Sequence, residues 1–203
     1  MSVPHMGPPL ADVGQARFTV TEAAQPQAPT VVIGAEQIRD RIRQLARQIS
    51  DDYRGTTLYC VGVLEDGFIF MADLVRELDV AVICQFIKPE HQEIPQGAGT
   101  ATEIFFSPEV NVPGAHVLLV QGLVETGITS EFLMRNLLAR GAASVKLAAL
   151  LDRPSSRRIS LQPEYVGFTV DDRYVFGYGL GAPELSRNLP YVASRSQGAS
   201  VSG

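Results

Sequence analysis

Short apolar runs that alternate with segments of helical periodicity constrain the fold of this chain more than any other feature of its sequence. Runs of this length and composition are typical of strands buried on both faces. They are LYCVGVL (residues 58–64), VAVICQFI (80–87), VLLV (117–120) and VKLAALL (145–151). Between these runs, residues 68–78 and 130–140 have apolar side chains at helical spacing, and Gly141 is typical of the residue that follows a helix. The alternation predicts an α/β fold, with a central parallel sheet covered by helices on both faces.

The N-terminal part of the chain divides into a tail and a helix. Residues 1–30 mix Pro, Gly, Ala and Gln with little apolar periodicity, so we expect a disordered tail there. From residue 35 on, isoleucine and leucine recur at helical spacing while arginines fall on the other faces. This pattern predicts an amphipathic helix on the core with a solvated arginine face. We assign residues 31–195 to one domain and residues 196–203 to a second disordered tail.

Two segments interrupt the alternation. Residues 88–111 are long and polar and contain Gly and Pro, and only residues 103–106 (EIFF) resemble a strand. A segment of this length inside a domain is often functional, so it is either a lid over a site or a disordered excursion. Farther along, residues 165–170 and 174–178 have the pattern of two short strands around residues 171–173. They predict a hairpin or a small hood.

Charge and composition disfavour several classes of protein. The net charge of −5, with no cluster of Lys and Arg, disfavours nucleic-acid binding. No apolar run approaches the roughly 20 residues that cross a bilayer, and the N-terminus lacks a signal-peptide pattern, so we expect a cytoplasmic protein without membrane contact. Cys60 and Cys84 lie in apolar runs and are expected to be reduced core thiols. The three histidines lack the spacing of a zinc site.

A candidate ligand site follows from the predicted sheet. Ligands of parallel sheets bind beyond the carboxyl ends of the strands, and three loops leave such ends, at residues 65–67, 121–129 and 152–154. The second loop contains Thr126, Gly127, Ile128 and Thr129 at the start of a helix. Backbone N–H groups, two hydroxyls and the helix dipole favour a bound phosphate there. The alternative is that Thr129 only caps the helix and Gly127 only makes the turn.

Five segments resemble a known family in order and in approximate spacing. They are VGVLEDGFIFMADLVREL, VLLVQGLVETGITSEFL, VKLAALLDRPSSRR, YVGFTVDDRYVFGYGL and RNLPYV. The second is similar to the phosphoribosyl diphosphate (PRPP) signature of type I phosphoribosyltransferases, and residues 31–194 resemble the hypoxanthine-guanine phosphoribosyltransferase family. The resemblance implies the type I fold, a central parallel sheet flanked by helices with a small hood. That family transfers ribose 5-phosphate from PRPP to a 6-oxopurine and releases pyrophosphate with the help of Mg²⁺.

The resemblance implies a phosphate loop and a catalytic base. Thr126, Gly127, Ile128 and Thr129 match the loop that holds the 5-phosphate. Glu125 matches the aspartate that helps to deprotonate purine N7. Its extra methylene is enough to misplace a general base by about 1 Å, which can cost roughly 100-fold in rate.

The same resemblance implies a base pocket. Arg153 stands where the family has a lysine that reads the purine 6-oxo group, and it remains a donor with different geometry. Tyr174 matches the aromatic side chain that stacks on the base, and Val175 would offer backbone groups to the purine edge.

Other positions depart from the family together. Gln121 and Gly122 stand where the family has Glu-Asp, the acids that hold the ribose hydroxyls and support magnesium. Gly181 replaces an aspartate near the purine and the second magnesium, and the Ser-Tyr pair of the family lid is not evident. In the pyrophosphate loop, Glu65, Asp66 and Gly67 stand where the family has Lys-Gly-Gly, so two acids occupy the first two positions. Arg187 matches the arginine of the family that contacts pyrophosphate.

Two hypotheses of function follow. The first is a phosphoribosyltransferase-like protein that binds a purine nucleotide, with PRPP-dependent transfer impaired or lost, which would make it a pseudoenzyme. The alternative is an active purine-salvage enzyme, a glycosyltransferase that makes IMP or GMP from hypoxanthine or guanine and PRPP with Mg²⁺. The altered metal, ribose and pyrophosphate positions favour the first. An α/β domain that binds no ligand is the remaining possibility. We assign no magnesium ligand. The resemblance to the family also implies a homodimer or a homotetramer.

Overall fold

The structure is a computed structural model that describes residues 29–96, 99–105, 110–181 and 186–194. The two predicted tails, residues 1–30 and 196–203, lie outside the described residues apart from residues 29 and 30. Thr30 already belongs to the first strand, β1 (Thr30–Ile33).

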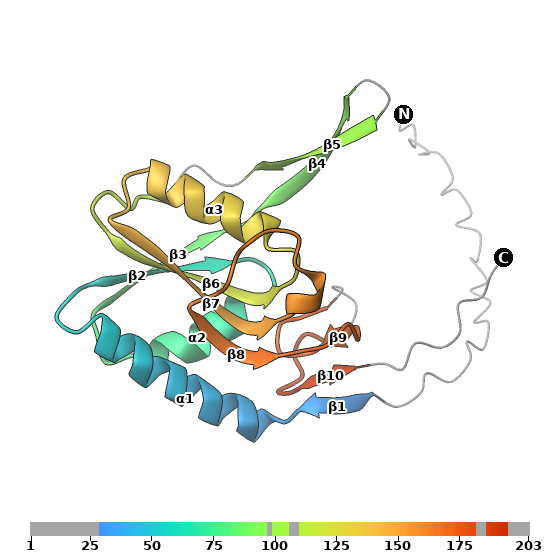
Figure 1. Cartoon of the computed structure of the whole chain (residues 1–203). Coiled ribbons are helices and arrows are strands. Elements are labelled where there is room, and N and C mark those ends of the chain that lie inside the picture. The colour runs from blue at the N-terminus through green and yellow to red at the C-terminus, as the bar shows by residue number, and fades with distance from the viewer. Residues whose placement is uncertain (1–28, 97–98, 106–109, 182–185, 195–203) are drawn as a thin grey trace, which may run out of the picture.

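A parallel sheet forms the centre of the described part of the chain (Figure 1). Its five strands run in the order β3-β2-β6-β7-β8, and every neighbouring pair is parallel. The strands are β2 (Leu58–Val63), β3 (Val82–Ile87), β6 (His116–Val124), β7 (Ser144–Asp152) and β8 (Tyr165–Thr169). The predicted central sheet is therefore confirmed.

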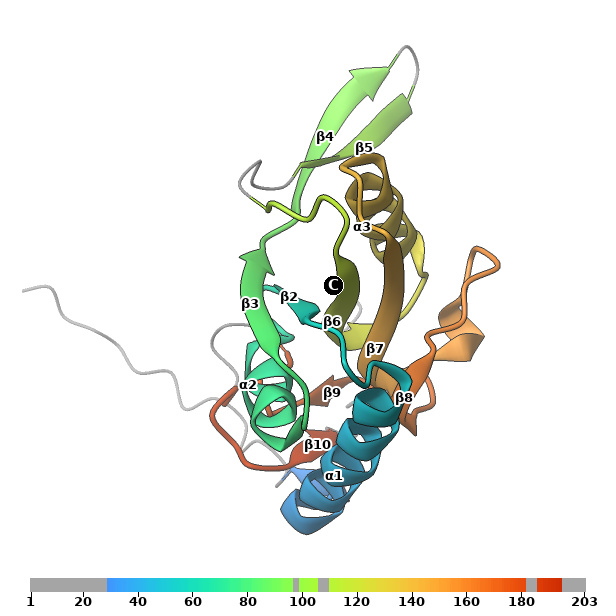
Figure 2. The same ribbon diagram turned by 90° about the vertical axis from the view of Figure 1, so that its left-hand side faces the viewer.

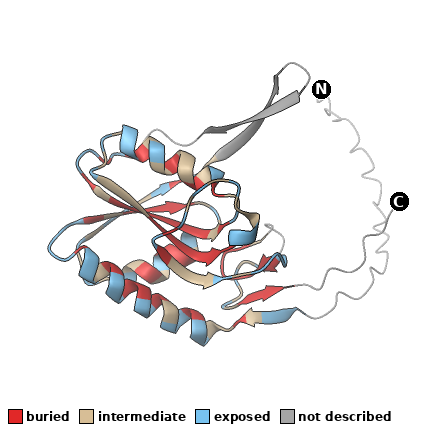
Figure 3. Ribbon diagram, viewed as in Figure 1, coloured by how far each residue is buried: buried red, intermediate tan, exposed pale blue. Residues whose placement is uncertain are grey.

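Helices cover both faces of this sheet, as predicted (Figures 1 and 2). The helices α1 (Ala35–Asp52) and α2 (Phe68–Glu77) lie on one face, and α3 (Ile128–Ala139) lies on the other. The apolar stripe of α1 is buried as expected, at Ile38, Ile42, Leu45 and Ile49. Two clusters of buried side chains result, one on each face of the sheet, and Figure 3 shows that β2, β6 and β7 are mostly buried.

A second, smaller sheet lies near the N-terminal end of α1 and contains one of the two segments predicted for the hood (Figures 1 and 2). It consists of β1, β10 (Val192–Ser194) and β9 (Val175–Phe176), paired antiparallel in that order. The predicted hairpin around residues 171–173 is wrong, because β8 pairs with β7 in the central sheet while β9 pairs with β10. Two strands that are close in sequence therefore belong to different sheets.

Residues 88–111 are more regular than predicted. They contain an antiparallel ribbon of β4 (Glu90–Gln96) and β5 (Gly99–Phe105), which projects from the body of the molecule (Figure 1). Only the end of β5 was expected. A projecting two-stranded ribbon need not bury a face, so its strands need not show the apolar alternation that reveals a strand in a sequence.

The prediction of two core thiols is half correct. Cys60 is buried in β2, but Cys84 is exposed, since β3 is the edge strand of the sheet and has a neighbour on one side only. A short 3₁₀ helix at Pro154–Ser156 follows β7. None of the helices in the described residues is both long and apolar enough to cross a membrane.

Candidate functional site

The sheet changes direction between β2 and β6, and a cavity of about 520 Å³ lies beyond the carboxyl ends of these two strands. From β2 the chain continues through α2 to β3 on one side, and from β6 it continues through α3 to β7 on the other. Such a switch point leaves a crevice where ligands bind in open α/β sheets. The sequence-predicted residues that line the cavity are Glu65, Asp66, Gln121, Glu125, Thr126, Gly127, Thr129 and Arg187.

The predicted phosphate loop, residues 126–129, follows β6 and runs into the first turn of α3. Gly127 precedes α3 with a φ of +83°, and the Ile128 N–H donates to Thr126 Oγ1 at 3.3 Å. The first turn of a helix leaves backbone N–H groups without intrahelical partners, and the helix dipole adds positive potential there. The N-cap is Gly127, so the alternative that Thr129 caps the helix is wrong. The side chain of Ile128 is 43 % exposed and does not line the cavity.

Gln121 lies inside β6 rather than in the loop that was predicted to begin there. Strand pairing with β7 continues from Gln121 through Val124, although Gln and Gly interrupt the apolar run. Gln121 is 5 % exposed, and its Oε1 accepts a hydrogen bond of 2.5 Å from the Ser130 hydroxyl. The amide oxygen that replaces a carboxylate is thus already bonded to the protein.

Gly122 is packed against the turn formed by residues 64–67. A Cβ atom at Gly122 would lie 2.5 Å from the backbone oxygen of Asp66 and 2.8 Å from Leu180 Cδ2. Gly67 is equally confined, since its Cβ would lie 2.7 Å from the Val63 oxygen. No side chain fits at either position unless the backbone moves.

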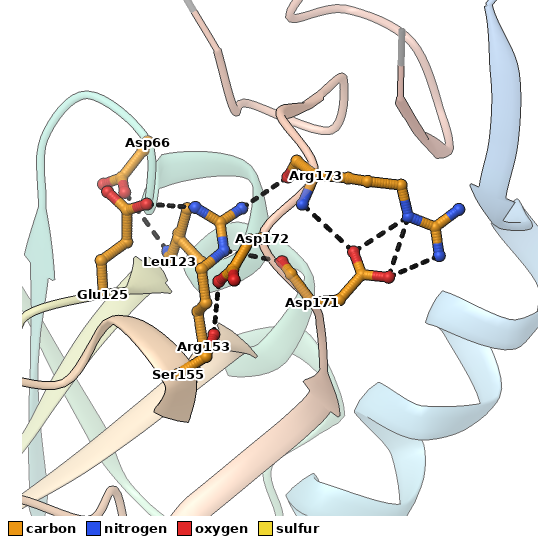
Figure 4. A network of polar contacts seen from close by, with 8 residues as sticks. All are labelled: Asp66, Leu123, Glu125, Arg153, Ser155, Asp171, Asp172 and Arg173. Carbon is orange, nitrogen blue, oxygen red and sulfur yellow. Dashed lines mark hydrogen bonds and ion pairs between the residues drawn. The ribbon is translucent and has the colours of Figure 1, made fainter. Parts of the chain in front are cut away.

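Asp66 reaches from this turn toward the end of β6 (Figure 4). Its Oδ2 accepts a hydrogen bond of 3.3 Å from the Leu123 N–H. Burial raises the pKa of Asp66 to about 6, an effect that backbone hydrogen bonds only partly offset. A carboxyl group of this kind is partly protonated in mildly acidic solution.

Glu65 forms ion pairs with two cations at the mouth of the cavity. Arg187 Nη1 lies 2.6 Å from Glu65 Oε2, and Lys88 Nζ lies 3.2 Å from Glu65 Oε1. The Arg187 hydrogen bond, followed by that of Lys88, holds the pKa of Glu65 below its usual value. Arg187 also donates from Nε and Nη2 to the Gly181 carbonyl, at 3.0 and 2.8 Å.

Arg153 connects the end of β7 to the loop that precedes β9 (Figure 4). The side chain is 8 % exposed, and its Nη1 forms an ion pair with Glu125. Its Nε donates to the Asp171 carbonyl at 2.8 Å and its Nη2 to the Arg173 carbonyl at 2.7 Å. The predicted catalytic residue and the predicted base-reading residue therefore contact each other directly.

The predicted base-pocket residues Arg153, Tyr174 and Val175 do not line the main cavity. Tyr174 is 42 % exposed, while Val175 is buried and lines a separate cavity of about 200 Å³ next to β8. Gly181 has a φ of +94°, and a Cβ atom there would lie 2.8 Å from Phe176 Cβ. The structure thus gathers residues predicted for the phosphate, the ribose and the pyrophosphate around the main cavity, whereas Arg153 is linked to it only through Glu125.

Two polar side chains among the described lining residues escaped the sequence analysis. Lys88 follows β3 directly, and Ser130 follows the Thr-Gly-Ile-Thr tetrapeptide. Lys88 could have been identified as a site residue from its place directly after a predicted strand, because all strands of a parallel sheet end at the same edge. Nothing in the sequence marked Ser130, whose partner Gln121 is known only from the fold.

The described residues do not fit a magnesium ion held by the protein itself. Mg²⁺ is usually bound by one or two carboxylates together with substrate phosphates. At the end of β6, Gln121 presents an amide that Ser130 already occupies, and Gly122 presents no side chain. Within the described ranges, no group of three or more His, Cys, Asp or Glu side chains could hold a metal. A metal would therefore depend on the phosphates of a substrate.

Comparisons with known proteins agree with this architecture. Residues 34–184 match the model of the phosphoribosyl transferase domain family. The chain is 31 % identical over 162 residues to the hypoxanthine-guanine phosphoribosyltransferase of Bacillus subtilis (strain 168), a match that spans 80 % of this chain and 90 % of that protein.

Solved structures give the same result. A hypoxanthine-guanine phosphoribosyltransferase from Bacillus anthracis has a TM-score of 0.70 and 32 % identity over 81 % of this chain and 96 % of the other. A hypoxanthine phosphoribosyltransferase from Staphylococcus aureus has a TM-score of 0.73 and 30 % identity over 82 % and 90 %. With its central parallel sheet and its cavity at the switch point, the chain belongs to the hypoxanthine-guanine phosphoribosyltransferase family of type I phosphoribosyltransferases.

Proposed function

We propose that this protein binds a purine nucleotide in the cavity at the end of β6, and that its PRPP-dependent transferase activity is slow. In this proposal the 5-phosphate lies at residues Thr126, Gly127, Ile128 and Thr129, and the base lies toward Arg153. The observation that carries the proposal is the glycine turn at the N-terminus of α3, which faces the cavity with two threonines. Backbone donors and a helix dipole favour a phosphate monoester whatever chemistry follows.

Arg153 supports the base end of this proposal. A guanidinium group has five N–H donors, and the described contacts use three of them, toward Glu125, Asp171 and Arg173. In this proposal, one of the two remaining N–H groups donates to a purine carbonyl oxygen. The contacts also fix the orientation of the group, so the donor directions are set before a ligand arrives.

Slow transfer is supported by the residues around the ribose and the diphosphate. Gln121 is bonded to Ser130, Gly122 lacks a side chain, and the Glu65 carboxylate lies where a diphosphate would need positive charge. Transfer requires stabilisation of a departing diphosphate anion, and carboxylates beside it have the opposite effect. Glu125 is also one methylene longer than an aspartate, which displaces a base from its proton.

An active purine-salvage enzyme is the second candidate, and the comparisons favour it. Relatives with about the same length as the matched region are named hypoxanthine-guanine phosphoribosyltransferases. The product would then be IMP or GMP, made with PRPP and with magnesium that the substrate holds. A shared fold does not decide between the candidates, because activity depends on the side chains of the site.

Turnover distinguishes the two. We would measure nucleotide formation from hypoxanthine, guanine and xanthine with PRPP and Mg²⁺, with the Bacillus subtilis relative assayed alongside. We expect a rate lower by about 100-fold or more, since a misplaced base alone can have that effect. A rate equal to that of the relative would establish the active enzyme and contradict our proposal.

Nucleotide binding is tested separately from turnover. GMP and IMP should raise the melting temperature, because a ligand that binds only the folded state stabilises it. Replacing both Thr126 and Thr129 with Val should weaken GMP binding by about tenfold, the loss expected for hydrogen bonds to a charged group. The control is Thr57→Val, at an exposed position outside the cavity. If neither GMP nor IMP changed the melting temperature, the proposed nucleotide binding would be contradicted. An α/β domain that binds no purine nucleotide would then be the supported interpretation.

A further inference from the structure

Three charged side chains from distant parts of the sequence meet at one end of the cavity. Glu65 follows β2, Lys88 follows β3, and Arg187 lies shortly before β10. All three line the cavity, at the end formed by the turn of residues 64–67. The phosphate loop enters the same cavity from β6 and α3, so these charges belong to a separate part of the wall.

The Glu65 carboxylate engages both cations at once. One of its oxygens lies 2.6 Å from Arg187 Nη1 and the other lies 3.2 Å from Lys88 Nζ. The Gly181 carbonyl accepts two further N–H groups of Arg187, at 3.0 and 2.8 Å. Arg187 therefore contacts the Glu65 carboxylate on one side and the Gly181 carbonyl on the other. The Glu65 carboxylate occupies the N–H donor that an anionic ligand would otherwise bind.

The charges that line the cavity disfavour a second anion. Among the described lining residues, the acidic side chains are Glu65, Asp66 and Glu125, and the basic ones are Lys88 and Arg187. A diphosphate at this end would have to displace Glu65 from its two partners. The displaced carboxylate would then remain beside a ligand of the same sign, which opposes binding.

We propose that Glu65 determines which phosphorylated ligand this cavity accepts. Its carboxylate replaces a ligand anion on Arg187 and Lys88, so the cavity takes a nucleoside monophosphate and disfavours a ligand that carries a diphosphate. This inference rests on the proposed nucleotide binding at the phosphate loop. It adds a residue that sets the ligand class through its contacts with Arg187 and Lys88, outside the loop of residues 126–129.

Calorimetric titration with inorganic pyrophosphate, and separately with GMP, tests the proposal. The full chain and its Glu65→Gln and Glu65→Lys variants would be compared, each with and without Mg²⁺. We expect Glu65→Gln to bind pyrophosphate at least about tenfold more tightly than the wild type, a change of about 1.4 kcal/mol. Glu65→Lys should bind it more tightly still, while GMP affinity should change by a smaller factor, because the ion pairs of Glu65 are with Arg187 and Lys88 and not with residues 126–129.

The control is Glu36→Gln, which removes a carboxylate from an exposed ion pair with Arg39 in α1, outside the cavity. It should leave both affinities unchanged. Glu65 is half-exposed, and exposed ion pairs contribute little to stability, so thermal melting should show that all variants are folded.

The outcomes separate this inference from the proposed function. Unchanged pyrophosphate affinity in Glu65→Gln, or an equal gain for GMP and pyrophosphate, would overturn the role of Glu65. Absence of GMP binding in every variant would overturn the proposed function. In that case a gain in pyrophosphate affinity would still support Glu65 as the internal partner of Arg187 and Lys88.

Discussion

At the scale of single residues, neighbouring positions of the site are fitted to one another. Gly122 lies so close to the Asp66 backbone that a Cβ atom has no room, and Asp66 in turn accepts a hydrogen bond from Leu123, the residue after Gly122. Gln121 is hydrogen-bonded to Ser130 and Glu65 to Arg187. Each of these positions therefore has a partner elsewhere in the site.

We expect Gly122→Ala to destabilise the protein. The new methyl group would lie 2.5 Å from the Asp66 oxygen, and backbone must shift to admit it. Overpacking of this kind costs about 1–3 kcal/mol, which urea unfolding can measure. The control is Gly34→Ala, where the nearest atom is the end of the Gln37 side chain at 3.3 Å, and a smaller loss is expected. Equal losses for the two variants would contradict the packing argument.

Asp66 predicts a specific dependence of stability on pH. Its pKa is raised to about 6 in the folded protein, so the folded state binds the proton more tightly than the unfolded state does. The stabilising contribution of the protonated group is complete below the unfolded pKa of 3.8 and is lost as pH rises through 6. At about 1.36 kcal/mol per pH unit, the loss is up to about 3 kcal/mol.

Asp66→Asn isolates this contribution. The variant keeps an oxygen for the Leu123 N–H but has no charge to bury. Its unfolding free energy should equal that of the wild type near about pH 4 and exceed it near about pH 8. Urea unfolding across this range measures the difference. If the two proteins keep a constant difference from acid to neutral pH, the carboxyl group of Asp66 is not buried as described.

At the scale of secondary-structure elements, Arg153 joins the end of β7 to the segment before β9. We expect Arg153→Lys to destabilise the protein by about 1–3 kcal/mol, because a lysine cannot reach two backbone carbonyls and Glu125 together. The control is Arg158→Lys at an exposed neighbouring position. The unfolding free energies of both variants test the prediction. Equal values would show that the hydrogen bonds of the Arg153 guanidinium group do not stabilise the segment before β9.

The elements also show how far the sequence could be interpreted. The buried strands β2, β6 and β7 and the helices α1, α2 and α3 were predicted, because burial imposes apolar runs and helical periodicity. The ribbon of β4 and β5 was missed for want of such a pattern. The separation of β8 from β9 was also missed, since strand partners far apart in sequence leave no local signal.

The site divides in the same way. Its location at the carboxyl ends of the strands was predicted, because every parallel strand ends at the same edge of the sheet, but the predicted loop from residue 121 begins only after β6 ends at Val124. The contacts of Gln121 with Ser130, of Glu125 with Arg153 and of Glu65 with Arg187 were not. They depend on how separate segments approach one another, and no residue pattern within one segment encodes that distance.

At the scale of the whole molecule, the edge strand β3 exposes apolar side chains. Ile83 is 39 % and Phe86 48 % exposed, on a strand that is at the edge of the sheet among the described strands. We expect the protein to sediment as a dimer or larger assembly, and Phe86→Glu to reduce its mass to that of a monomer. The control is Val31→Glu in the smaller sheet, at an equally exposed position. A wild type that sediments as a monomer would contradict this assembly.

The contact between Gly122 and Asp66 also bears on how the site could be engineered. An acidic side chain introduced at position 122 meets the backbone of the neighbouring turn, so it needs a second change that reshapes residues 64–67. The two segments therefore have to be redesigned together, and single substitutions at position 122 are expected to yield no well-folded acidic variant.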